Sequence, residues 1–242
     1  MTPHDTAEAT TIPVSRLTSN FMTDPDTFTW AAGQGFENID FYFGGRLGVL
    51  GEAPSDVAAA AITFFNPDVV HAAWEGAGKV MGREQAAVAF AGQAYRWADD
   101  HLPDDAADWG RLAELAAAVV DAASPAAAPI FAGWRELDVP AGNDRHRAVH
   151  HLNGLRELRM ARHGAAVVAT GLDVSDAVQH KTPWMMGIYG WPEREQPPEV
   201  AERWAQAEAL TNQSTGTDYA MLDGADAEDF VRLSTAANDA IT

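Results

Sequence analysis

Three histidines, three arginines and one glutamate are gathered in one short stretch of the sequence, HHLNGLRELRMARH, which spans residues 150–163. Histidine changes its charge near neutral pH, and a carboxylate can accept a proton or orient a histidine. Arginine binds carboxylates and other planar anions with paired hydrogen bonds. Together these side chains could perform acid–base chemistry on a small molecule or hold an anionic ligand.

A helix of 3.6 residues per turn sorts this stretch into faces. Leu152, Leu155 and Leu158 form one apolar stripe, which is typical of a helix that packs on a core. The polar side chains take three positions around the stripe. Arg159 and Arg162 lie beside it, Arg156 and His163 lie on its flank, and His146, His150 and Glu157 lie on the opposite side.

Two interpretations of this polar set remain open at this point. In the first, the side chains form a solvated face, where each ion pair contributes only about 0.3–0.5 kcal/mol. In the second, both sides of the helix are covered and the charged groups line a cavity. Burying charge is costly unless it is paired, so a buried cluster usually serves a site. Helical spacing alone favours the solvated face.

Other common site motifs are absent from the sequence. His146 and His150 are spaced to share a metal ion, but no H-E-x-x-H motif accompanies them, and the chain contains no cysteine. There is also no G-x-S-x-G, no Walker loop and no G-x-G-x-x-G after a strand. We therefore predict neither a metal site nor a cofactor.

The charge balance argues against nucleic acid and membrane partners. The chain has 35 acidic and 16 basic residues, for a formal net charge of −19. Proteins that bind duplex DNA gain much of their affinity from Lys and Arg on phosphates. No apolar run approaches the roughly 20 residues that a membrane helix needs, and the N-terminus lacks the features of a signal peptide. We expect a cytoplasmic protein without membrane contacts.

Apolar residues repeat at helical spacing along nearly the whole chain, which predicts an all-α fold with little or no sheet. We expect residues 1–22 to form a flexible arm, followed by helical halves over 23–130 and 131–242. The segments 43–56 and 131–144 are similar, which indicates either a pseudo-repeat or a chance likeness of Ala- and Gly-rich sequences. Gly44 and Gly45 are expected to loosen a helix whose start Asp24 or Asp26 could cap.

Residues 162–181 have the outline of a helix-turn-helix, with a turn at Gly171 and a capped second helix. The leading residues of such a second helix read the major groove. Here they include Asp173 and Asp176, which repel phosphate, and only Lys181 near the end is basic. We interpret this pair as a degenerate helix-turn-helix that serves packing.

Several motifs resemble those of the actinobacterial EvbL-like family, which is described as helix-turn-helix or MarR-like. They are DFYFGGRLGVLGEAP with AITFFNPDVVHAAW, LRELRMARHGAAVVATGL, and the closing AERWAQAEALTNQSTGTDYAML. The resemblance covers roughly residues 25–240. Where the family tends to have histidine this chain has Leu158, and Met160, Ala161 and Arg162 replace Gly-Asp-Gly. The matching positions are Tyr42, Arg46, Leu50, Gly51, Asn66, Pro67, Arg156, Glu157, Arg159 and His163.

The resemblance implies two winged-helix-like halves and a place in specialised metabolism, and it shifts the balance towards a buried polar cluster. Our first hypothesis is a small-molecule-binding protein, an unusual enzyme, with a pocket between the halves. His163 would carry the proton, Glu157 would orient it or act as a base, and Arg159 would complete the catalytic set. The residues expected to bind substrate are Arg46, Tyr42, Asn66, Trp74, Arg156 and His150.

Two other hypotheses stay open. A MarR-type regulator that responds to a ligand would need a homodimer and a basic helix that faces the DNA groove. A partner-binding or scaffold protein would have no chemistry, and only the acidic surface supports it. The first hypothesis requires that His163 and Arg46 do not project into bulk solvent on unrelated surfaces.

Overall fold

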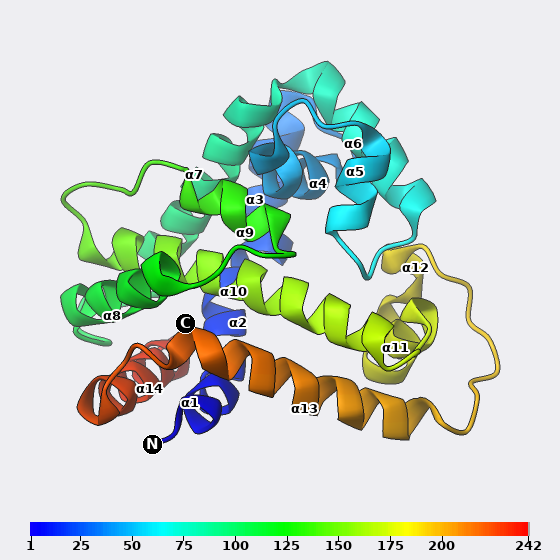
Figure 1. The fold of residues 1–242 in the computed structure, drawn as a ribbon. Helices are drawn as coiled ribbons and strands as arrows, with labels where there is room; N and C mark the ends of the chain where they lie inside the picture. Colours follow the sequence, from blue (N-terminus) through cyan, green and yellow to red (C-terminus); the bar gives the residue numbers. More distant parts are fainter. Residues whose placement is uncertain (242) are drawn as a thin grey trace.

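A computed structural model describes residues 1–241, and every regular element in that range is helical. The all-α prediction is confirmed. Figure 1 shows the arrangement. The α-helices are α1 (Pro3–Ala9), α2 (Thr11–Thr23), α3 (Pro25–Gln34), α4 (Asp40–Leu47), α5 (Ser55–Ala61), α6 (Pro67–Val80), α7 (Arg83–His101), α8 (Trp109–Ala122), α9 (Pro129–Arg135), α10 (Asp144–Ala169), α11 (Val174–Lys181), α12 (Met186–Tyr189), α13 (Val200–Tyr219) and α14 (Gly224–Asp239), with 3₁₀ turns η1 (Gly48–Leu50) and η2 (Pro183–Met185).

Helix α10 runs through the middle of the molecule as one continuous helix of 26 residues. It packs against α8 and α9, against α2 and α7, and against α13 along its other side. Neighbours on several sides explain why polar residues of the 150–163 stretch are buried, including His150, Arg156, Glu157 and His163. The solvated-face interpretation is therefore wrong for these four residues.

The first 22 residues do not form a flexible arm, contrary to our expectation. They fold into α1 and most of α2, and α1 lies against α13 while α2 packs on α10 and α14. Val14, Leu17 and Phe21 point into the core, and the last two are fully buried. These residues recur at helical spacing in the sequence, so the signal for an amphipathic helix was present.

Glycines bring helices into close contact rather than loosening them. A Cβ added at Gly44 would lie 2.4 Å from the Cβ of Ala77 on α6, and one at Gly45 would lie 2.6 Å from Phe90 on α7. In α10, a Cβ at Gly164 would come 2.4 Å from the Thr63 hydroxyl oxygen. These close approaches hold α4 and α10 near the segments that will form the site.

The largest apolar core joins Phe21 of the expected arm with residues from both expected halves, such as Phe90, Leu112, Leu152 and Phe230. Residues 1–241 contain no strand, so neither half carries the β-hairpin wing of a winged helix. The similar segments 43–56 and 131–144 both run from a short helix through a turn into a new helix. Their second helices differ, because α5 ends at Ala61 whereas α10 continues to Ala169.

Candidate functional site

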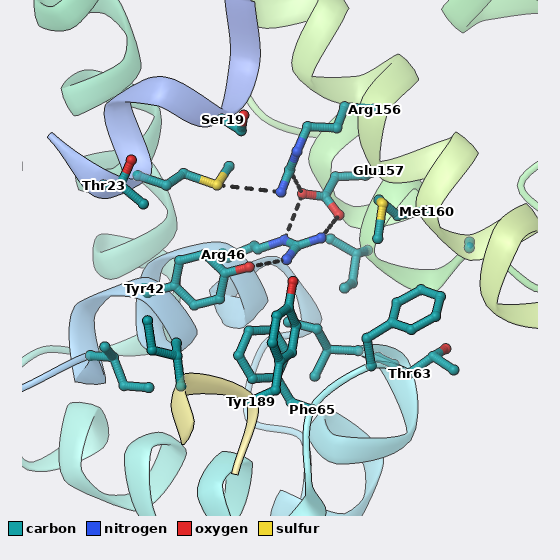
Figure 2. A pocket seen from close by; sticks show the side chains of 18 of the residues that line it. Ser19, Thr23, Tyr42, Arg46, Thr63, Phe65, Arg156, Glu157, Met160 and Tyr189 are labelled. Atoms are coloured by element: carbon teal, nitrogen blue, oxygen red, sulfur yellow. Dashed lines mark hydrogen bonds and ion pairs between the residues drawn. The ribbon is translucent and has the colours of Figure 1, made fainter. Parts of the chain in front are cut away.

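A buried cluster of charged side chains connects α4 to α10. The Glu157 carboxylate accepts two hydrogen bonds from Arg46, at 2.8 Å from Nε to Oε1 and 2.9 Å from Nη2 to Oε2. Arg156 donates a third bond to Oε1 of Glu157, and Arg46 also donates to the Tyr42 hydroxyl. Two-bond pairing of this kind between arginine and carboxylate is strong and directional. The cluster therefore fixes the geometry of one wall between the helices (Figure 2).

The cluster contains one more positive than negative group. Arg46, Arg156 and Glu157 are all at most 8% exposed, and among residues 1–241 Glu157 is the only carboxylate that contacts either arginine. Burial opposes ionisation of Glu157, but the charges of Arg46 and Arg156 outweigh it and hold its pKa below the ordinary value. Burial and the nearby Arg46 lower the pKa of Arg156. Arg156 thus carries a positive charge that Glu157 does not fully compensate.

A cavity of about 460 Å³ opens beside this cluster. We call it the first cavity. Its walls are mostly apolar and come from α2, α4, the 61–65 segment, α10 and the 185–189 segment. Figure 2 shows the Tyr189 hydroxyl pointing towards the guanidinium of Arg46. The lining includes Ser19, Met22, Ile39, Tyr42, Arg46, Phe64, Phe65, Arg156, Glu157, Met160 and Tyr189.

A second cavity of about 510 Å³ adjoins the first. Ser15, Phe64, Arg156, Met160 and Tyr189 line both of them, so these side chains form the shared wall. The charged residues that line only the second cavity come from α2, α10, α11 and α13. They are Arg16, Arg159, His163, Lys181 and Glu208.

His163 is held firmly in the second cavity. Its ring stacks on Phe64 with centroids 5.3 Å apart and meets Trp204 edge-on at 5.1 Å. Nδ1 lies 2.9 Å from the Thr211 hydroxyl oxygen, and Nε2 lies 3.6 Å from Oε1 of Glu208. Burial lowers the pKa of His163, and Glu208 opposes this shift only in part. Arg159 donates to Asn212 at 2.8 Å and lies 3.8 Å from Glu208.

The structure therefore divides the predicted site residues among several places. Tyr42, Arg46, Arg156 and Glu157 meet at the first cavity, while Arg159 and His163 lie in the second. Neither Arg46 nor His163 projects into bulk solvent, because their exposures are 3% and 9%. Glu157 does not contact His163, whose partners are Thr211 and Glu208. The catalytic roles of these groups stay predictions.

Three predicted site residues line neither cavity. Asn66 caps α6 and donates to the carbonyl of Gly190 at 3.0 Å, which ties the 61–66 segment to the end of α12. Trp74 is 1% exposed, donates to the Ala53 carbonyl, and has the Arg83 guanidinium 3.5 Å from its ring centroid. His150 bonds to Tyr95. Their observed contacts are structural.

Replacing Trp74 by phenylalanine should lower the free energy of unfolding by about 1–2 kcal/mol, because a fully buried ring becomes smaller and the part-buried Ala53 carbonyl loses its donor. Urea unfolding monitored by circular dichroism measures this loss. Trp184 is 77% exposed. Trp184→Phe should therefore change the stability by less than about 0.5 kcal/mol. Equal effects of the two variants would contradict a structural role for the Trp74 indole nitrogen.

His150 should titrate far below the usual range of histidine. Burial, and next the nearby His151, lower its pKa to about 4, and its Nδ1 lies 2.7 Å from the Tyr95 hydroxyl. A depressed histidine pKa means that the unfolded chain binds the proton more readily. The stabilising contribution is complete above the ordinary pKa of 6.5 and is lost as the pH falls towards 4. Histidine NMR titration should show this resonance still neutral at pH 6.5; a normal midpoint would contradict the burial.

The helix-turn-helix outline is present, but its second helix is covered. Gly171 has a positive φ of 69° in the turn after α10, and Asp173 caps α11. Ser175, Asp176, Ala177 and Val178 of α11 are buried. Arg194 binds the Asp176 carboxylate with a 2.8 Å bond from Nε and also contacts Asp173. The N-terminal end of α11 is thus occupied by the chain itself.

Several residues of the cavities were missed by the sequence analysis. Tyr189 and Met185 come from a segment to which the sequence analysis assigned no site residue, and in the structure that segment contains η2 and α12. Glu208 and Trp204 line the second cavity, and Thr211 bonds to His163 beside it. The three recur at helical spacing on α13, which indicated that they share one face but not which residues that face contacts. Ser15, Ser19 and Met22 were not considered because we expected residues 1–22 to form a flexible arm.

The fold and site define an all-helical protein with two adjoining cavities, both partly open to solvent, and a buried arginine–glutamate–arginine cluster between its helices. Comparison with protein families finds a match to a helix-turn-helix family over residues 7–201. The chain belongs to this helix-turn-helix family. No curated protein and no solved structure matches the chain. The narrower resemblance to the EvbL-like family stays a prediction.

None of the helices within residues 1–241 combines the length and the apolar character that a membrane crossing requires.

Proposed function

We propose that the protein binds a small, largely apolar ligand that carries one acidic group, with the acid at Arg156 and Arg46 in the first cavity. The observation that carries this proposal is the surplus positive charge of the buried Arg46–Glu157–Arg156 cluster at the cavity wall. An arginine that lacks a full counter-charge in a buried place is destabilising unless an anion completes its pairing. A ligand carboxylate would supply that anion.

The rest of the first cavity suits the apolar body of such a ligand. Small-molecule sites are concave and mostly apolar, with a few polar groups that set orientation. Phe65, Ile39 and Met160 offer apolar contact, while Tyr42 and Tyr189 place hydroxyl groups near the arginines. A volume of about 460 Å³ is in the usual range for such pockets. Aromatic or alicyclic acids are the class that fits best.

A pair of matched probes tests this function. We expect 2-naphthoate to bind measurably in isothermal titration calorimetry, and 2-naphthamide to bind at least about tenfold more weakly, because the amide has no charge to pair with arginine. The two probes share size and shape, so the comparison isolates the charge. Equal affinity for both, or no binding of either, would refute the proposal.

The family membership supports a second candidate, a MarR-type regulator that responds to the ligand. The covered end of α11 and the net charge of −19 argue that this helix would not read DNA in the described conformation. An electrophoretic mobility shift at low salt, with DNA flanking the protein's own gene, tests this candidate. The absence of a shift at micromolar protein would eliminate it.

Catalysis on the ligand, a cytoplasmic location, a homodimer and a place in specialised metabolism remain predictions. Glu157 is a poor proton carrier because both of its oxygens accept hydrogen bonds from arginine. Among the predicted catalytic residues, His163 is better suited to exchange protons. An acid–base reaction on the bound ligand would therefore depend on the second cavity.

A further inference from the structure

The hydrogen bonds around His163 determine which of its nitrogens carries the proton. The Thr211 hydroxyl has a single hydrogen, and it donates that hydrogen to the Ala207 carbonyl at 2.7 Å. Its oxygen can then only accept from Nδ1 of His163 at 2.9 Å. With the opposite tautomer, Thr211 would have to give up its bond to Ala207, and Nε2–H would face Glu208 at 3.6 Å, beyond hydrogen-bond range.

In the neutral imidazole, the nitrogen that does not carry the proton is an acceptor. Nε2 of His163 is therefore an acceptor without a donor in residues 1–241, on a side chain that is 11% exposed and lines the second cavity. The nearby Glu208 carboxylate is also an acceptor, so it cannot satisfy Nε2. Burial keeps the pKa of His163 below the ordinary value and favours this neutral form.

We propose that the second cavity is a binding site for the hydroxyl group of a phenol or enol, whose O–H donates to Nε2 of His163. The charged groups that line this cavity match the polarity of such a hydroxyl. Arg16, Arg159 and Lys181 are positive and favour the partly negative oxygen, whereas Nε2 and Glu208 attract the hydrogen. The rings of Phe64 and Trp204 provide apolar surfaces for the body of the ligand.

This inference deepens the proposed function, because the two cavities share a wall, but its evidence is separate. The first cavity selects an acid through arginine, and the second selects a hydroxyl donor through histidine. A natural ligand that uses both would be a hydroxylated aromatic or enolic acid. The acid site and the hydroxyl site can each be refuted without the other.

A neutral probe, which cannot form an ion pair with the arginines, tests the second cavity. We expect 2-naphthol to bind about tenfold more tightly than 2-methoxynaphthalene, which has the same rings but no hydrogen to donate. His163→Met should abolish that preference. His163→Gln should retain part of it, because its amide oxygen is an acceptor near the position of Nε2. A preference that survives in His163→Met would overturn the proposal.

A second measurement does not depend on any variant. Nitrogen-15 NMR of the histidine side chains at neutral pH should show His163 as the neutral Nδ1–H tautomer, and saturating 2-naphthol should shift its Nε2 resonance. Finding the Nε2–H tautomer, or no shift with 2-naphthol, would also overturn the proposal. If 2-naphthoate binds while 2-naphthol shows no donor preference, only this inference fails. If 2-naphthol behaves as expected and 2-naphthoate does not bind, the proposed acid site fails instead.

Discussion

Glu157→Gln should destabilise the protein by about 3–5 kcal/mol, the loss expected when one partner is removed from a buried ion pair. Glutamine keeps the shape of the side chain but removes the charge that Arg46 and Arg156 share. Its amide can accept a bond through one oxygen only, and its NH₂ group would face a guanidinium that also donates. Two buried arginines would be left without a counter-charge.

Chemical unfolding by urea measures this loss directly. Glu114→Gln is a matched control, because Glu114 has a 66% exposed side chain and an ion pair with Arg111 at 3.8 Å. An exposed pair contributes about 0–1 kcal/mol, so this variant should be nearly as stable as the native chain. If Glu157→Gln were equally mild, the two arginines could not both be charged and dependent on Glu157.

The loss of stability in Glu157→Gln should also depend on pH. Arg46 and Arg156 overcome the effect of burial and hold the folded pKa of Glu157 below its ordinary value of 4.5. A carboxylate with a lowered pKa contributes stability that is complete above 4.5 and is lost as the pH falls through the folded value. The stability difference between the native chain and Glu157→Gln should therefore shrink below pH 4.5. A difference that stays constant as the protein is acidified would contradict this assignment.

Helical spacing of apolar residues predicted the all-α fold, and local signals predicted some of the helix ends. Asp24 and Asp173 cap α3 and α11, as short polar side chains do at helix starts, and Asn66 caps α6, where a substrate contact was expected instead. The loosening expected at Gly44 and Gly45 was wrong, because the lack of a side chain can serve close packing as well as flexibility. Which use a glycine has depends on its neighbour in space.

The candidate site was predicted in part, and the reason lies in sequence separation. Helical spacing brought Arg156, Glu157 and His163 to attention, since they lie within two turns of one helix. Their partners come from far away in the chain, because Arg46 lies 111 positions before Glu157 and Thr211 lies 48 positions after His163. The resemblance pointed to Arg46 and Tyr42, but no local pattern shows which nitrogen of His163 is free. That information exists only in the packing of α10 against α4 and α13.

Arg156→Met should separate binding from stability more clearly than any other change at the first cavity. Methionine fills a similar volume without charge, and the two-bond pair between Arg46 and Glu157 remains. Removing one partner of a buried ion pair is costly when it leaves the other charge unpaired, but here Arg46 still neutralises Glu157. We therefore expect the free energy of unfolding to fall by no more than about 1 kcal/mol.

The affinity for 2-naphthoate should fall far more in the same variant, by about 10- to 150-fold, because a hydrogen bond to a charged group contributes about 1.5–3 kcal/mol. Calorimetry and urea unfolding on one preparation give both numbers. Arg147→Met is the control, since Arg147 lies on the same helix, pairs with Asp144 and has a 37% exposed side chain. Undiminished 2-naphthoate binding in Arg156→Met would place the acid elsewhere. A large loss of stability would show that Arg156 is needed to hold Glu157 in place. The two measurements therefore distinguish an arginine that binds the ligand from one that only stabilises the fold.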